Sequence, residues 1–157
     1  MPGAPRRVTV GRGGEPVYKT ILIGTDGSPT AEIALARAIA LAKLTGATLH
    51  VATIAESEPT LSSPWEQTAA PSSRSDFQAD VALQTALERH GGADLDTQQH
   101  VRTGEPAKEI VAIAREEDAD LIVLGSVGMR GAGRVLGSVP NSVSHRAPCD
   151  VVIVKTV

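Results

Sequence analysis

Signals for strands and helices alternate along this chain of 157 residues. Short apolar runs indicate strands, and alanine-rich or amphipathic stretches indicate the helices between them. The last two apolar runs, from Leu121 to Leu124 and from Val151 to Val154, are continuous and each follows an aspartate, as is typical of buried parallel strands. Such alternation predicts a doubly wound α/β fold, a parallel sheet joined by right-handed helical crossovers.

The expected elements are five strands and four helices. The strands are expected at residues 20–23, 48–54, 97–101, 121–124 and 151–154. The first helix is expected to start at Pro29 after a Ser28 cap and to stop at Gly46. The others are expected after a capping box at Ser75, after the turn 104–106, and at Ser138. The polar strand at 97–101 is expected at an edge of the sheet.

Two segments are expected to lie outside the regular elements. Residues 1–17 are rich in glycine, proline and arginine, and we expect a disordered tail before a domain at 18–157. Residues 57–74, dominated by serine, threonine, proline and alanine, are expected to form a long loop.

Composition excludes several classes of function. The net charge is −3, from 15 Lys and Arg against 18 Asp and Glu, so the chain has no overall basic footprint for nucleic acid or anionic lipid. No apolar run is long enough to cross a membrane, and no secretory signal is visible at the N-terminus. The single cysteine, Cys149, excludes a disulfide framework within the chain and a multi-cysteine zinc site. A cytoplasmic protein is therefore expected, with Cys149 as a small buried residue rather than a nucleophile.

A glycine-rich segment at residues 125–140 carries the strongest chemical signal. Five glycines let the backbone approach a ligand, and Ser138 opens a helix whose free N–H groups favour an anion. Pro140 falls in the first turn of that helix, where a missing N–H costs nothing. The charged residues from Ser126 to Cys149 are all arginines, Arg130, Arg134 and Arg146. The segment is therefore predicted to hold a phosphate group.

Other interpretations of this segment remain open. It could be a flexible turn with solvated arginines, or Gly131, Gly133 and Gly137 could be a variant dinucleotide fingerprint. The fingerprint should open a complete βαβ unit, but here only one helix and one strand follow. A Walker A loop does not fit either, because neither the spacing nor the lysine is present.

The turn at residues 24–28 is the second candidate. Asp26 follows the first strand, where a carboxylate can accept hydrogen bonds from a ribose or from backbone amides of its own turn. No metal site is expected, since the four histidines are dispersed in the sequence, without an i,i+4 pair. No pair of residues has a spacing that requires acid–base catalysis, so no catalytic residue is assigned.

Three blocks of the chain together resemble the universal stress protein family. They are the first strand with its Thr25-Asp26-Gly27-Ser28 turn, residues 104–126, and residues 137–154. Nucleotide-binding members have the pattern Gly, two residues, Gly, nine residues, Gly, then Ser or Thr. Here Gly125, Gly128, Gly137 and Ser138 match, but eight residues separate the second and third glycines. The resemblance implies a sheet of order 3-2-1-4-5 with helices on both faces, similar to the adenine nucleotide α-hydrolases.

The resemblance also implies an adenine-nucleotide site. ATP, with Mg²⁺, is the first choice, and AMP or cyclic AMP is the alternative. Asp26 would bind ribose, the backbone of Ile54 would meet adenine and Gly125 would approach the ribose. Gly128, Gly137, Ser138 and Val139 would hold phosphates. The implied binding residues are Gly24, Thr25, Asp26, Ile54, Leu124, Gly125, Gly128, Arg130, Arg134, Gly137, Ser138, Val139 and Pro140.

The final strand points to a homodimer, an assembly that the resemblance also implies. An apolar edge strand from Val151 to Val154 would aggregate unless it were covered, and pairing with a second copy covers it. The expected function is a stress-linked sensor or reservoir of adenine nucleotide. A nucleotide-free dimeric interaction module is the alternative, and an enzyme, either a slow ATPase or a dehydrogenase, is a third.

Overall fold

Five parallel strands form the centre of the computed structural model, which describes residues 14–55, 73–127 and 138–156. The strands are β1 (Thr20–Thr25), β2 (Thr48–Ala55), β3 (Thr97–Thr103), β4 (Leu121–Gly125) and β5 (Asp150–Val154). Their order is β3-β2-β1-β4-β5, and each neighbouring pair is parallel. The predicted doubly wound sheet and its order are confirmed, with the polar strand β3 at one edge.

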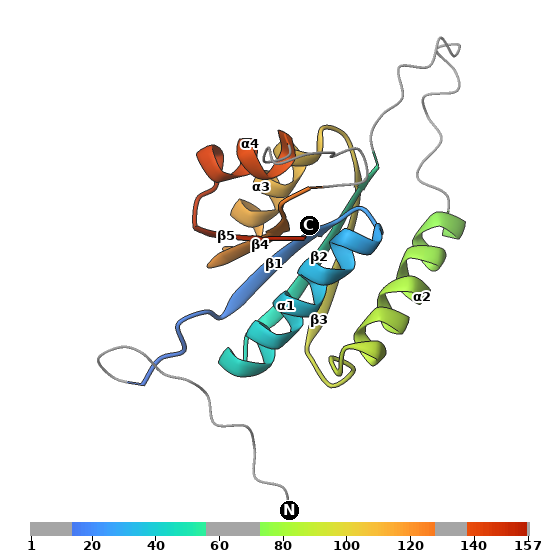
Figure 1. Ribbon diagram of the computed structural model, residues 1–157, viewed down its shortest axis with the longest axis horizontal. Coiled ribbons are helices and arrows are strands. Elements are labelled where there is room, and N and C mark those ends of the chain that lie inside the picture. Colours follow the sequence, from blue (N-terminus) through green and yellow to red (C-terminus); the bar gives the residue numbers. More distant parts are fainter. Residues whose placement is uncertain (1–13, 56–72, 128–137, 157) are drawn as a thin grey trace, which may run out of the picture.

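Four helices cover the two faces of this sheet (Figure 1). They are α1 (Pro29–Thr45), α2 (Ser73–Arg89), α3 (Pro106–Glu116) and α4 (Ser138–Arg146). Alternate residues of the strands point to opposite faces, so the sheet has two cores. On one face Ile21, Ile23 and Val123 pack with residues of α1 and α2. On the other, Leu22 and Ile122 pack against α3 and α4.

The first helix begins and ends where its sequence predicts. The Ser28 hydroxyl accepts a hydrogen bond from the N–H of Ala31 at 3.1 Å, and Pro29 occupies the first turn. At the other end Gly46 takes a left-handed conformation, φ 72°, and its N–H donates to the carbonyl of Ala42. Only glycine adopts this conformation without steric cost. Both caps are thus set by single residues.

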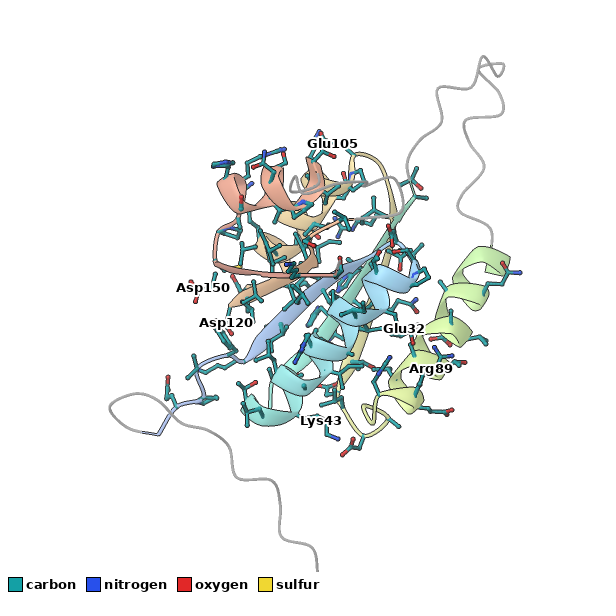
Figure 2. All side chains as sticks on the ribbon, viewed as in Figure 1. Glu32, Lys43, Arg89, Glu105, Asp120 and Asp150 are labelled. Atoms are coloured by element: carbon teal, nitrogen blue, oxygen red, sulfur yellow. The ribbon has the colours of Figure 1, made fainter. Side chains whose placement is uncertain are left out.

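Ion pairs and hydrogen bonds fasten α2 to α1. Figure 2 shows Glu32 of α1 facing Arg89 of α2, and these two side chains form an ion pair. His90 also contacts Glu32, with 3.0 Å between its Nε2 and the carboxylate, and the Lys43 ammonium donates to the carbonyl of Gly91 at 2.6 Å. The hydrogen bonds from Arg89 and His90 lower the pKa of the Glu32 carboxyl, which therefore stays ionised.

Aspartates fasten the amino ends of the central strands. The Asp120 carboxylate accepts hydrogen bonds from the backbone N–H groups of Lys19, at 2.8 Å, and Thr20, at 2.9 Å. The Tyr18 hydroxyl donates to Asp150 at 3.3 Å. Asp120 and Asp150 lie close together at this end of the sheet in Figure 2. The aspartates that flank the two apolar runs therefore have a structural role.

One expected helix start is wrong. Helix α2 starts at Ser73, so Ser75 lies within the helix instead of capping it, and the loop expected to extend to Arg74 ends earlier. Nothing in the sequence between Ser73 and Asp76 stops a helix, because serine is only a moderately poor helix former. Residues 1–13 of the tail predicted at 1–17, and residues 57–72 of the loop predicted at 57–74, lie outside the described residues. Within the described part, no helix is long and apolar enough to span a bilayer.

Candidate functional site

The carboxyl ends of β1 and β4 lie side by side at the centre of the sheet. The two strands pair in register, with Ile23 opposite Val123. From β1 the chain moves outward through β2 and β3, and then returns to the other side of β1 to form β4 and β5. Ligands of doubly wound proteins bind at this point, where the strand order reverses. Both sequence candidates, the turn after β1 and the segment after β4, start here.

The turn after β1 is built by its own side chains. The Asp26 carboxylate accepts a hydrogen bond from the N–H of Ser28 at 2.9 Å, and the Thr25 hydroxyl accepts one from the N–H of Gly27 at 3.2 Å. Gly27 adopts φ 73°, a left-handed conformation that favours glycine. The structural interpretation of Asp26 as a turn-forming residue is confirmed. Its contact with a ribose stays a prediction.

Close packing explains the glycine at the end of β1. A Cβ on Gly24 would lie 2.8 Å from Ile110 Cδ1 and 2.9 Å from Leu124 Cδ2. Ile110 and Leu124 are both 3% exposed, so neither side chain can move aside freely. Leu124 is therefore a core residue by its side chain. At the predicted site positions Gly24 and Leu124, close packing therefore leaves no room for a side-chain contact with a ligand.

A hydroxyl pair that the sequence analysis missed holds the start of the glycine-rich segment. The N–H of Ser126 donates to the carbonyl of Val154 at 2.8 Å, and the Ser126 hydroxyl accepts from the N–H of Thr156 at 3.1 Å. The hydroxyls of Ser126 and the buried Thr156 lie 3.3 Å apart. A Cβ on Gly125 would meet Thr156 Cγ2 at 3.3 Å, so glycine allows this close approach. Thr156 lies outside every motif, and no sequence signal points to it.

The first turn of α4 is arranged around its buried proline. Ser138 is exposed, Val139 is half-buried against the second core, and Pro140 is buried. The side chain of Pro140 therefore packs α4 onto the molecule. Ile54, on β2, is half-buried against the same core. The predicted phosphate-binding residues Gly128, Arg130, Arg134 and Gly137 lie outside the described residues.

Cys149 has the character expected of a structural residue. It is partly buried against the second core, just before β5. Burial, and then the nearby negative charge of Asp150, raise the pKa of its thiol. At neutral pH the thiol stays protonated, and the protonated form is a poor nucleophile.

The fold is that of a doubly wound α/β protein, with a carboxylate-bearing turn after β1 and a glycine-rich sequence after β4, where the strand order reverses. Residues 17–155 match the sequence model of the universal stress protein family. The chain belongs to this family.

Curated relatives agree over nearly the whole length of the chain. A universal stress protein of Mycobacterium tuberculosis is 36% identical over 149 residues, which cover 88% of this chain and 97% of the relative. A putative universal stress protein of Staphylococcus aureus is 36% identical over 143 residues, which cover 88% of this chain and 85% of the relative.

Solved structures agree with the fold, and two of them contain a nucleotide. The universal stress protein UspA of Lactobacillus plantarum has a TM-score of 0.73 at 24% identity, covering 88% of this chain and 98% of that one. A universal stress protein in complex with cAMP has a TM-score of 0.67 at 32% identity, covering 90% of this chain and 99% of that one. A third, from Archaeoglobus fulgidus in complex with dAMP, has a TM-score of 0.62 at 25% identity, covering 88% of this chain and 99% of that one.

Proposed function

We propose that this protein binds an adenine nucleotide at the carboxyl ends of β1 and β4. The observation that carries the proposal is the meeting of the Asp26 turn and Gly125 where the strand order reverses. The similar proteins in complex with cAMP and dAMP support the choice of an adenine nucleotide. The family membership supports a role in the stress response, as a cytoplasmic sensor or reservoir of the nucleotide.

Each part of the nucleotide has a proposed partner. Asp26 accepts hydrogen bonds from the ribose hydroxyls, the backbone of Ile54 meets adenine, and Gly125 lies beside the ribose. The amino end of α4 attracts the phosphates, because its first N–H groups lack partners within the helix. The proposed phosphate ligands are Gly128, Arg130, Arg134, Gly137, Ser138 and Val139. ATP with Mg²⁺ is the first choice, and AMP or cyclic AMP is the alternative.

The nucleotide can be identified directly. The purified protein is denatured, and the small molecules released are analysed by mass spectrometry. Equilibrium dialysis with ATP, AMP and cyclic AMP then ranks their affinities. We expect one adenine nucleotide per chain and a melting temperature that rises with its concentration. A protein that releases no nucleotide and binds none of the three would contradict the proposal and favour a nucleotide-free interaction module.

The substitution Asp26→Asn tests the ribose contact. Asparagine keeps an oxygen that can accept the Ser28 N–H, so the turn and the melting temperature should be preserved. The loss of the charged acceptor should lower the affinity for adenosine nucleotides by about tenfold, since hydrogen bonds to charged groups contribute about 1.5–3 kcal/mol. Isothermal titration calorimetry measures the change. Asp26→Ala is a second variant, which also removes the hydrogen bond within the turn. Unchanged nucleotide affinity in both variants would exclude a ribose contact by Asp26.

We further propose that two copies associate through β5. Among the described strands β5 pairs with β4 alone, and its apolar Val152 is 38% exposed. A charge in the middle of a paired edge should prevent association. Val152→Asp is therefore expected to give a monomer by light scattering. Leu44→Asp is the matched control, because Leu44 is 51% exposed and belongs to α1, outside the proposed β5 edge. A wild-type monomer, or a dimer that survives Val152→Asp, would contradict this interface.

A further inference from the structure

Two histidines that lie fifty positions apart in the sequence meet on neighbouring strands. In the β2–β3 register, Ala52 lies opposite His100, so His50 is displaced from His100 by two residues and shares its face of the sheet. His50 Nδ1 and His100 Nε2 are 2.9 Å apart. The two rings are stacked, with centroids 5.2 Å apart and planes inclined by 14°. The histidines that are dispersed in the sequence thus form a pair in space.

A carboxylate completes this cluster. Glu117 follows the last residue of α3, and its Oε2 lies 3.9 Å from His50 Nδ1. One ligand atom from each of His50, His100 and Glu117 can be chosen so that all three lie within 4.8 Å of one another.

We propose that His50, His100 and Glu117 form a binding site for one divalent transition-metal ion of the zinc class. Two imidazoles and one carboxylate are a common protein ligand set for zinc, and three protein ligands leave a fourth position for water. Ligand nitrogens at about 2.0–2.1 Å from zinc lie about 3.3 Å apart in a tetrahedron. The metal would therefore separate the two nitrogens by a few tenths of an ångström and replace the hydrogen bond between them.

Both histidines of the cluster have lowered pKa values. Burial, and then the proximity of His100, lower the pKa of His50, while Glu117 and Asp96 oppose that shift. Burial lowers the pKa of His100 as well, with Arg102 acting in the same direction and Glu117 and Glu116 against it. Both rings are then neutral at pH 7, the form that binds metal.

The guanidinium of Arg102, a cation that acts on His100, is engaged by other carboxylates. It forms an ion pair with Glu116 and lies 3.7 Å from Glu109. Glu117, whose Oε2 lies 3.9 Å from His50 Nδ1, faces the histidines from the end of α3. This carboxylate is thus available to neutralise a bound ion.

The location separates this site from the proposed nucleotide site. His50 is the third residue of β2, and Glu117 lies at the end of a helix that runs back toward the amino ends of the strands. The nucleotide is proposed at the opposite, carboxyl end of the sheet. The His50 side chain is 5% exposed and that of Glu117 is 34% exposed, so an ion would enter from the side of Glu117. The metal proposal therefore does not depend on nucleotide binding.

The proposal is tested by titrating the full chain with Zn²⁺ and measuring the heat of binding by isothermal titration calorimetry. We expect one ion per chain and a higher melting temperature with zinc. Titration with Co²⁺ gives a second readout, because tetrahedral Co²⁺ absorbs visible light much more strongly than hydrated Co²⁺. The Co²⁺ spectrum should lack the near-ultraviolet charge-transfer band of a thiolate ligand, which would otherwise point to Cys149.

Matched variants assign the ligands. Glu117→Gln and His100→Gln each remove one ligand, and each should lower the affinity for Zn²⁺ by about tenfold or more. His90→Gln is the control, because His90 also contacts a carboxylate, Glu32, yet lies on the other face of the sheet. It should bind Zn²⁺ as the wild type does. Glu117 is partly exposed, so Glu117→Gln should fold, and it decides the question alone if His100→Gln does not fold.

Three results would overturn the proposal. The first is the absence of heat and of Co²⁺ bands at excess metal, which would leave the two histidines as a hydrogen-bonded structural pair. The second is a zinc affinity that Glu117→Gln leaves unchanged. The third is a Co²⁺ spectrum with thiolate character. Nucleotide affinity measured on the same variants should not change, so failure of one proposal is distinguishable from failure of the other.

Discussion

Ser138→Asp is expected to reduce adenine-nucleotide affinity by about a hundredfold while α4 stays folded. Ser138 is the exposed first residue of α4, where the proposed function places a phosphate. Two like charges about 4 Å apart repel by about 4 kcal/mol at an effective dielectric constant of 20, and exposure to water reduces this value. An aspartate at a helix amino end interacts favourably with the helix dipole, so the substitution should not destabilise α4. Calorimetric titration with ATP measures the loss.

Ser144→Asp is the control for this variant. Ser144 is exposed in the last turns of the same helix and donates a hydrogen bond to the carbonyl of Asn141. The substitution changes the net charge by the same amount, about 9 Å along the helix from Ser138. It should leave the nucleotide affinity near that of the wild type. Equal losses in both variants would indicate a general charge effect, and full affinity in Ser138→Asp would show that the phosphates bind elsewhere.

Most of the fold could be predicted because its signals are local. The caps at Ser28 and Gly46 each depend on one residue and its immediate neighbours, and both are found as predicted. The continuous apolar run of β4 indicates burial on both faces, and the structure places this strand between β1 and β5. The start of α2 was predicted wrongly because Ser72, Ser73 and Ser75 each offer a local start signal, and no residue between Ser73 and Asp76 stops a helix.

The candidate site was predictable only in part. The turn formed by Asp26 depends on residues two positions apart, so its hydrogen bond to Ser28 could be expected. The Ser126–Thr156 pair could not, because β4–β5 pairing joins residues thirty positions apart. The cluster of His50, His100 and Glu117 was missed for a related reason. An i,i+4 search finds metal ligands on one helix, whereas these ligands come from two strands and a helix end.

Leu22→Ala is expected to have the largest effect on stability. Leu22 is 0% exposed in the middle of β1, the central strand, where it lies between His50 of β2 and Ile122 of β4. Removing three carbon atoms from a close-packed position loses transfer free energy and leaves a cavity, at a cost of about 2–5 kcal/mol. A protein of this size has a free energy of unfolding of about 5–15 kcal/mol, so the loss is a large fraction of it. Urea unfolding followed by circular dichroism measures the change.

Leu44→Ala makes the same chemical change where it should cost little. Leu44 is 51% exposed near the end of α1, so its side chain already contacts water in the folded protein. Alanine is at least as good a helix former as leucine, and the free energy of unfolding should change by about 0.5 kcal/mol or less. Comparable losses for the two variants would mean that β1 does not lie at the centre of the sheet. A large difference places the core beneath β1, the strand that leads into the Asp26 turn of the proposed nucleotide site.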